Sequence, residues 1–177
     1  RRLCEEHAPI SVVRAMEDDA TGFPDTLWKQ FAEIGINGVL IPEAYGGSAQ
    51  SILDAAIVYE ELGRALAPTP HFASAVVGAR VLLAAGDDAQ KKAWLPRIAS
   101  GEAILAPAWL EPDGGFGPRG VRCRAASTDG GATFTLTGVK RHVAFAAAAT
   151  RLLVLARTGE ADRDVDLFLV DPTAPGV

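Results

Sequence analysis

The sequence has little of several residue types that mark particular kinds of protein. Its 177 residues include two cysteines, Cys4 and Cys123, which lie far apart in sequence and so have no partner cysteine at a ligand spacing. This pattern argues against a disulfide framework, a zinc site and a redox dithiol. We therefore expect two reduced, structural cysteines and no metal site.

An excess of positive charge and long apolar runs are also missing. The 17 basic residues are outnumbered by 22 acidic ones, giving a net charge of -5, which argues against nucleic acid as a partner. The most apolar stretch, 73–85, is short and contains Arg80, and the first residues do not resemble a signal peptide. We expect no membrane span and a cytoplasmic location.

Hydrophobic residues make up 49% of the chain, and in the first part they recur at helical spacing. The pattern predicts helices over 23–35, 52–62, 71–85 and 87–98. Asp87 and Gln90 form a capping-box pair at the start of the last one. Because proline has no amide hydrogen and crowds the preceding turn, we expect Pro96 to break or kink that helix.

Beyond Gly101 the pattern changes to short runs rich in β-branched and aromatic residues, which predict strands. The glycines of Thr128-Asp129-Gly130-Gly131 favour a tight hairpin turn and antiparallel pairing. Helices followed by strands predict an α+β, multidomain chain: an all-α domain over 1–103 and an antiparallel β-domain over 104–177. The last predicted strand leaves an open edge, so we expect the β-domain to be incomplete. The predicted strands are 104–109, 121–126, 133–138, 152–156 and 167–170.

Five motifs, in this order along the chain, resemble those of the acyl-CoA dehydrogenase family and together cover nearly the whole sequence. The combination of an acidic helix start, paired lysines, Leu-Pro and Ser-Gly-Glu in the third motif is the most specific. The motifs are IPEAYGG at 41–47, YEELGRA at 59–65, GDDAQKKAWLPRIASGE at 86–102, LEPDGG at 110–115 and LTGVKRHVAFA at 136–146.

The resemblance implies an enzyme of lipid metabolism with three domains, of which the C-terminal helical domain is absent from this chain. Such an enzyme binds FAD and an acyl-CoA and removes two hydrogens across Cα–Cβ, giving an enoyl-CoA and reduced flavin. The catalytic glutamate of the family lies in the C-terminal domain, so the catalytic residue is unknown here. Implied partners are an electron-transfer flavoprotein and further subunits, in a homo- or hetero-oligomer such as a dimer of dimers.

The resemblance also implies which residues face the ligands. Leu110 stands where the family has a threonine that bonds the flavin, and His142, Val143 and Ala144 replace a Trp-Ile-Thr triplet beside it. Phe116 stands where a family serine contacts the acyl-CoA, and it is the predicted substrate-binding residue. The predicted FAD-binding residues are Trp109, Leu110, Glu111, His142, Val143 and Ala144.

These replacements leave three functions open. The chain is predicted to belong to a catalytic dehydrogenase subunit, or to a non-catalytic partner subunit with weak or no flavin binding in a heteromeric dehydrogenase, or to an oxidase or monooxygenase. Two interpretations of His142 also stay open: it stacks on or hydrogen-bonds the flavin and protonates its reduced N5, or it is an ordinary hairpin histidine. His7 and His71 have no neighbouring ligands or nucleophiles and are assigned no role.

Overall fold

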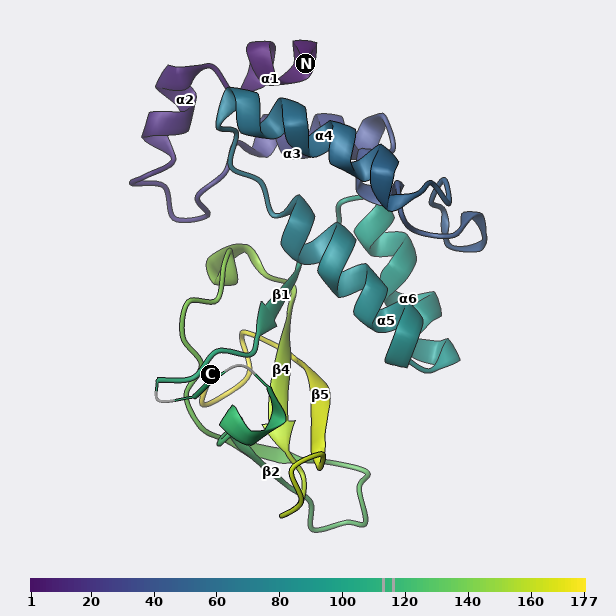
Figure 1. Cartoon of the computed structure of the whole chain (residues 1–177), viewed down its shortest axis with the longest axis vertical. Helices are drawn as coiled ribbons and strands as arrows, with labels where there is room; N and C mark the ends of the chain where they lie inside the picture. Colours follow the sequence, from purple (N-terminus) through teal and green to yellow (C-terminus); the bar gives the residue numbers. More distant parts are fainter. Residues whose placement is uncertain (113, 116) are drawn as a thin grey trace.

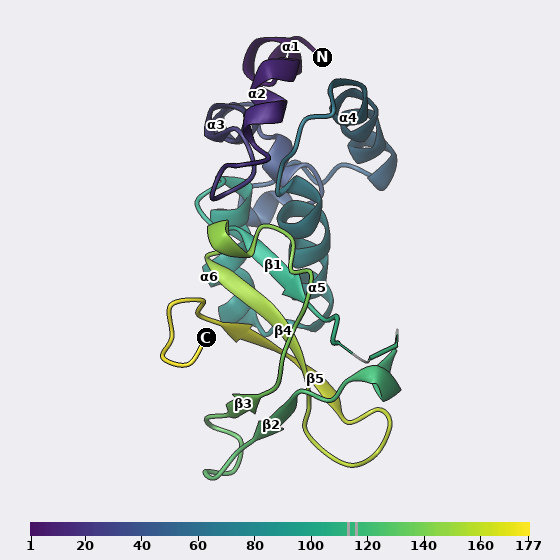
Figure 2. The same ribbon diagram turned by 90° about the vertical axis from the view of Figure 1, so that its left-hand side faces the viewer.

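The computed structural model describes residues 1–112, 114, 115 and 117–177. Helices occupy one end of the molecule and a five-stranded sheet the other, with the β2–β3 hairpin furthest from the helices (Figures 1 and 2). The α+β class is confirmed, and none of the helices in the described part could cross a membrane. The helices are α1 (Arg2–His7), α2 (Ile10–Ala15), α3 (Asp25–Glu33), α4 (Ile52–Ala65), α5 (Ala79–Ala85) and α6 (Asp88–Ala99).

Helix α5 continues from a π-helical segment, η3 (Phe72–Gly78), so the helix predicted over 71–85 is present with a widened first half. Four short 3₁₀ segments lie in the connections: η1 (Ile36–Gly38), η2 (Glu43–Tyr45), η4 (Pro118–Gly120) and η5 (Ala146–Ala148). The predicted capping box is confirmed, because the Gln90 amide donates to the Asp87 carboxylate over 2.7 Å and the Asp87 amide donates to Gln90 over 3.0 Å.

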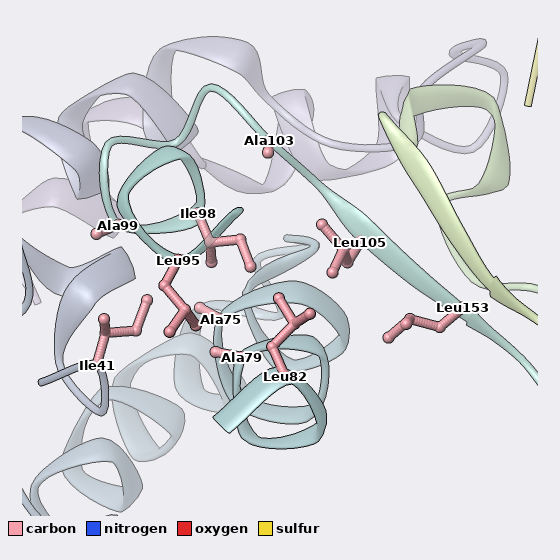
Figure 3. Close-up of a cluster of buried hydrophobic side chains, with 10 residues drawn as sticks. All are labelled: Ile41, Ala75, Ala79, Leu82, Leu95, Ile98, Ala99, Ala103, Leu105 and Leu153. Carbon is pink, nitrogen blue, oxygen red and sulfur yellow. The ribbon is translucent and has the colours of Figure 1, made fainter. Parts of the chain in front are cut away.

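The expected break at Pro96 is wrong, because α6 runs through the proline. An interior proline costs about 3 kcal/mol or more. Leu95 and Ile98, on either side of it, are fully buried, and each contributes about 1.5–3 kcal/mol. Figure 3 shows Leu95 directed toward Ala75, with Ile98 beside it in the same buried cluster. Burial of these neighbours therefore offsets the cost of the proline.

The sheet is mixed, so the expectation of an antiparallel domain holds for only part of it. Central β4 (Arg151–Arg157) pairs antiparallel with β5 (Val165–Val170) but parallel with β1 (Leu105–Ala108). β2 (Arg124–Ala126) forms the predicted hairpin with β3 (Thr135–Thr137) and meets the end of β4 in parallel. The long connection between β1 and β4 permits the parallel pairing, which sequence periodicity cannot reveal.

The helices and the sheet share one core. Leu105 of β1 and Leu153 of β4 are buried against α5 and α6 (Figure 3). The backbones approach closely there, since a Cβ on Gly78 would lie 2.9 Å from that of Leu105. The buried Ser74 hydroxyl also accepts a hydrogen bond from the Leu105 amide over 3.1 Å. β1 is thus fixed against the helices, and its C-terminal end carries the first predicted site segment.

Candidate functional site

The site lies just after the end of β1, and Glu111 is its central residue. The carboxylate of Glu111 is buried, with 5% of the side chain exposed, and it accepts hydrogen bonds from three groups of the chain. The Lys140 ammonium donates over 2.6 Å, the Arg122 amide over 2.8 Å and the Cys123 amide over 3.1 Å. Burial alone would raise the pKa of Glu111, but these bonds, led by the one from Lys140, hold it below its usual value. Glu111 is therefore an anchor and remains ionised.

A second segment lies beside the first. The Arg141 amide donates to the Leu110 carbonyl over 2.8 Å, next to the ion pair of Glu111 and Lys140. Gly138 lets the second segment lie against Cys123, because a Cβ at Gly138 would be only 2.7 Å from the backbone of Cys123. The motifs at 110–115 and 136–146, which are distant in sequence, are thus held together by a hydrogen bond and a buried ion pair.

A cavity of about 330 Å³ opens beside the first segment. Its lining is mostly apolar, and the indole of Trp109 at its edge is 43% exposed. The amides of Leu110 and Glu111 donate no hydrogen bond to any described residue, so they are available to a ligand. The described lining residues are Trp109, Leu110, Gly115, Gly117, Val121 and Leu155.

The predicted site residues fall into separate groups. Trp109 and Leu110 line the cavity, whereas the Glu111 carboxylate is turned into the ion pair. His142 is exposed and does not line this cavity, and its backbone takes the left-handed φ of 52°. Phe116 lies outside the described residues.

The two residues after His142 also differ from each other. Val143 packs against the sheet core, whereas Ala144 is exposed. The chain then turns so that the ring of Phe145 meets that of Phe23 of the helical part at 5.8 Å. The second predicted segment is therefore attached to the sheet on one side and to the helices on the other.

Three residues of the site were not predicted from the sequence: Lys140, Val121 and Leu155. Lys140 was not singled out, because a lysine followed directly by Arg141 gives no local sign that its side chain is buried against a glutamate of another motif. Val121 and Leu155 line the cavity but lie in runs that periodicity assigns only to strands. No group of three His, Cys, Asp or Glu among the described residues could hold a metal ion, and both cysteines are free and buried.

The three histidines differ in their surroundings, and His71 is the buried one. Its Nε2 lies 3.0 Å from the Ile36 carbonyl, which can only accept, so Nε2 carries the hydrogen. Nδ1 then accepts from the Tyr59 hydroxyl over 2.7 Å. Burial lowers the pKa of His71, which favours this neutral form. His71, to which the sequence assigned no role, is thus a buried packing residue of the helical part.

Nearly the whole chain matches two known domains. Residues 1–102 match the acyl-CoA dehydrogenase N-terminal domain, and residues 106–177 match the middle domain of the same family. The chain is 31% identical to mitochondrial isovaleryl-CoA dehydrogenase of Arabidopsis thaliana over 165 residues, which cover 90% of this chain and 40% of the relative. It spans about a quarter to two fifths of the length of such curated relatives.

Solved structures agree in fold. The chain superposes on the ChsE4-ChsE5 complex from Mycobacterium tuberculosis with a TM-score of 0.84 and 27% identity, covering 99% of this chain and 45% of that one. An acyl-CoA dehydrogenase of Bacillus anthracis complexed with FAD gives a TM-score of 0.78 at 25% identity, covering 99% and 31%. Two domain matches in the correct order and this agreement in fold show that the chain belongs to the acyl-CoA dehydrogenase family.

Proposed function

We propose that this chain supplies the N-terminal and middle domains of a subunit of an FAD-dependent acyl-CoA dehydrogenase. The observation that carries the proposal is the cavity beside Trp109 and Leu110, which has a mostly apolar lining and includes Leu110, whose backbone amide donates no hydrogen bond to a described residue. The bound flavin would supply a hydride acceptor for the β-hydrogen of an acyl-CoA, while the α-hydrogen would leave as a proton to a base outside the described residues. The product would be the α,β-unsaturated thioester.

The residues of this chain would bind and orient the flavin. The amides of Leu110 and Glu111 suit the pyrimidine edge, which presents acceptors, and Trp109 and Leu155 would exclude water. No described residue is assigned the role of base. The electron acceptor would be an electron-transfer flavoprotein or a similar protein, and we place the enzyme in the cytoplasm as an oligomer.

Anaerobic titration of the purified full-length protein with acyl-CoA thioesters of differing chain length and branching tests this function. We expect loss of the visible flavin absorbance and formation of enoyl-CoA, identified by mass. A flavin-containing protein that no thioester in the panel reduces would contradict the proposal. Leu110→Thr restores the hydroxyl of the family and should retain flavin at least as well as the natural sequence.

A second candidate is a non-catalytic partner subunit in a heteromeric dehydrogenase. It is favoured by Leu110 and Ala144, which offer no hydroxyl where the family has threonine, and by His142, which does not line the cavity. The similar structure from Mycobacterium tuberculosis is itself a complex of two proteins. Expression alone and with a neighbouring family member separates the cases: flavin present only in the complex would favour the partner role.

A further inference from the structure

The ion pair of Glu111 and Lys140 differs from the others in the described part of the chain. Its side chains are 5% and 9% exposed, whereas each other pair has at least one side chain more than 40% exposed. Taking two charges out of water carries a penalty that their attraction repays only with good geometry and further hydrogen bonds. A buried pair of this kind is therefore poorly explained by stability alone.

The geometry around the pair indicates what it fixes. Both carboxylate oxygens of Glu111 are bonded: one to the Lys140 ammonium and the Cys123 amide, the other to the amides of Arg122 and Cys123. Glu111 is thus tied at once to the strand entry at β2 and to the segment before His142. A shift of either segment would break a charge-assisted bond in a site that water does not reach.

Leu110 is held from both sides by this arrangement. Its carbonyl accepts from the Arg141 amide over 2.8 Å, and the next residue is the anchored Glu111. Leu110 lines the cavity, and its amide donates no hydrogen bond to a described residue. The position of the cavity wall is therefore set by bonds that lie behind it.

We infer that Glu111 and Lys140 are positioning residues, which hold the backbone of Leu110 in place to bind the flavin without contacting the flavin themselves. This inference rests on the proposed function. Lys140 contributes a positive charge at the end of a long side chain. Arginine should therefore replace it in part, whereas an apolar side chain of similar length should not. The affinity for FAD should depend on the pair more than on the overall stability of the chain.

The test compares Lys140→Met and Lys140→Arg with Leu82→Ala in the full-length protein. Leu82 is buried in the helical core (Figure 3) and does not line the cavity, so its truncation destabilises the fold without removing a contact of the site. Two quantities are measured: the dissociation constant for FAD, and hydrogen exchange of the Arg141 amide in the flavin-free protein. The exchange measurement needs neither flavin nor activity.

We expect Lys140→Met to weaken FAD binding and speed exchange at Arg141 by about tenfold each, the effect of losing one hydrogen bond to a charged group. In Lys140→Arg, the dissociation constant for FAD and the exchange rate at Arg141 should each stay within about threefold of their values in the natural sequence. Equal effects of Lys140→Met and Leu82→Ala on both quantities would overturn the inference. Should the natural protein bind no FAD, the proposed function fails, and unchanged exchange at Arg141 would separately refute the positioning role.

Discussion

Replacement of Tyr59 by phenylalanine tests the buried hydrogen bonds of the helical domain. The Tyr59 hydroxyl donates over 2.7 Å to Nδ1 of His71, a residue with no exposed surface. In Tyr59→Phe this nitrogen loses its donor, and no water can replace it at a fully buried position. An unsatisfied buried polar group costs about 1–3 kcal/mol, so we expect the free energy of unfolding to fall by that amount.

Urea unfolding followed by circular dichroism measures this loss. Tyr45→Phe is the matched control, because Tyr45 is the other tyrosine of the chain, is also half-buried against a core and forms no hydroxyl hydrogen bond within the described residues. It should change stability by less than about 0.5 kcal/mol. An equal loss in both variants, or none in Tyr59→Phe, would refute the assigned bond and the Nε2–H form of His71.

Three further predictions concern other contacts. Ser74→Ala removes the acceptor of the Leu105 amide and should cost about 1–3 kcal/mol in the same urea assay, whereas Ser100→Ala, at an exposed helix end, should cost much less. Gly47→Ala should not yield a stable fold, because a Cβ there would collide with the Ile41 carbonyl at 2.0 Å; native-like circular dichroism and melting would contradict this. Acid should weaken the fold through Glu111, because its pKa is lower in the folded chain than in the unfolded chain. The stabilisation from Glu111 is therefore fully present above its unfolded pKa of about 4.3 and is lost as the pH falls through its folded pKa. Thermal melting from neutral to acidic pH should show a smaller loss in Glu111→Gln, and an identical loss would contradict that assignment.

Local sequence patterns predict much of the fold and less of the site. The capping box at Asp87 and the antiparallel pairing around Gly130 follow from short-range chemistry, and the structure confirms both, although the connection over 127–134 is longer than the expected tight turn. Short-range rules fail at Pro96, where tertiary burial outweighs the local cost. They also cannot show that β1 and β4 pair in parallel, because the pairing depends on segments about 45 residues apart in sequence.

The candidate site shows the same division. Motif resemblance identified the segments around Leu110 and His142, because each lies within a continuous stretch of the chain. The bond between Glu111 and Lys140 was not predicted, since their side chains meet only through the packing of β1, β2 and the hairpin. The resemblance also grouped His142 with the flavin-facing residues; in the structure its side chain is exposed and does not line the cavity at Leu110, so its role stays a prediction.

The flavin content of the purified full-length protein tests the central claim most directly. Flavin released by denaturation is measured per polypeptide, for the protein alone and co-expressed with a neighbouring family member. We expect close to one molecule of FAD per copy of this chain in at least one of these preparations. Absence of FAD from both, together with no binding of added FAD, would contradict the assignment of the cavity beside Trp109 and Leu110 as a flavin site.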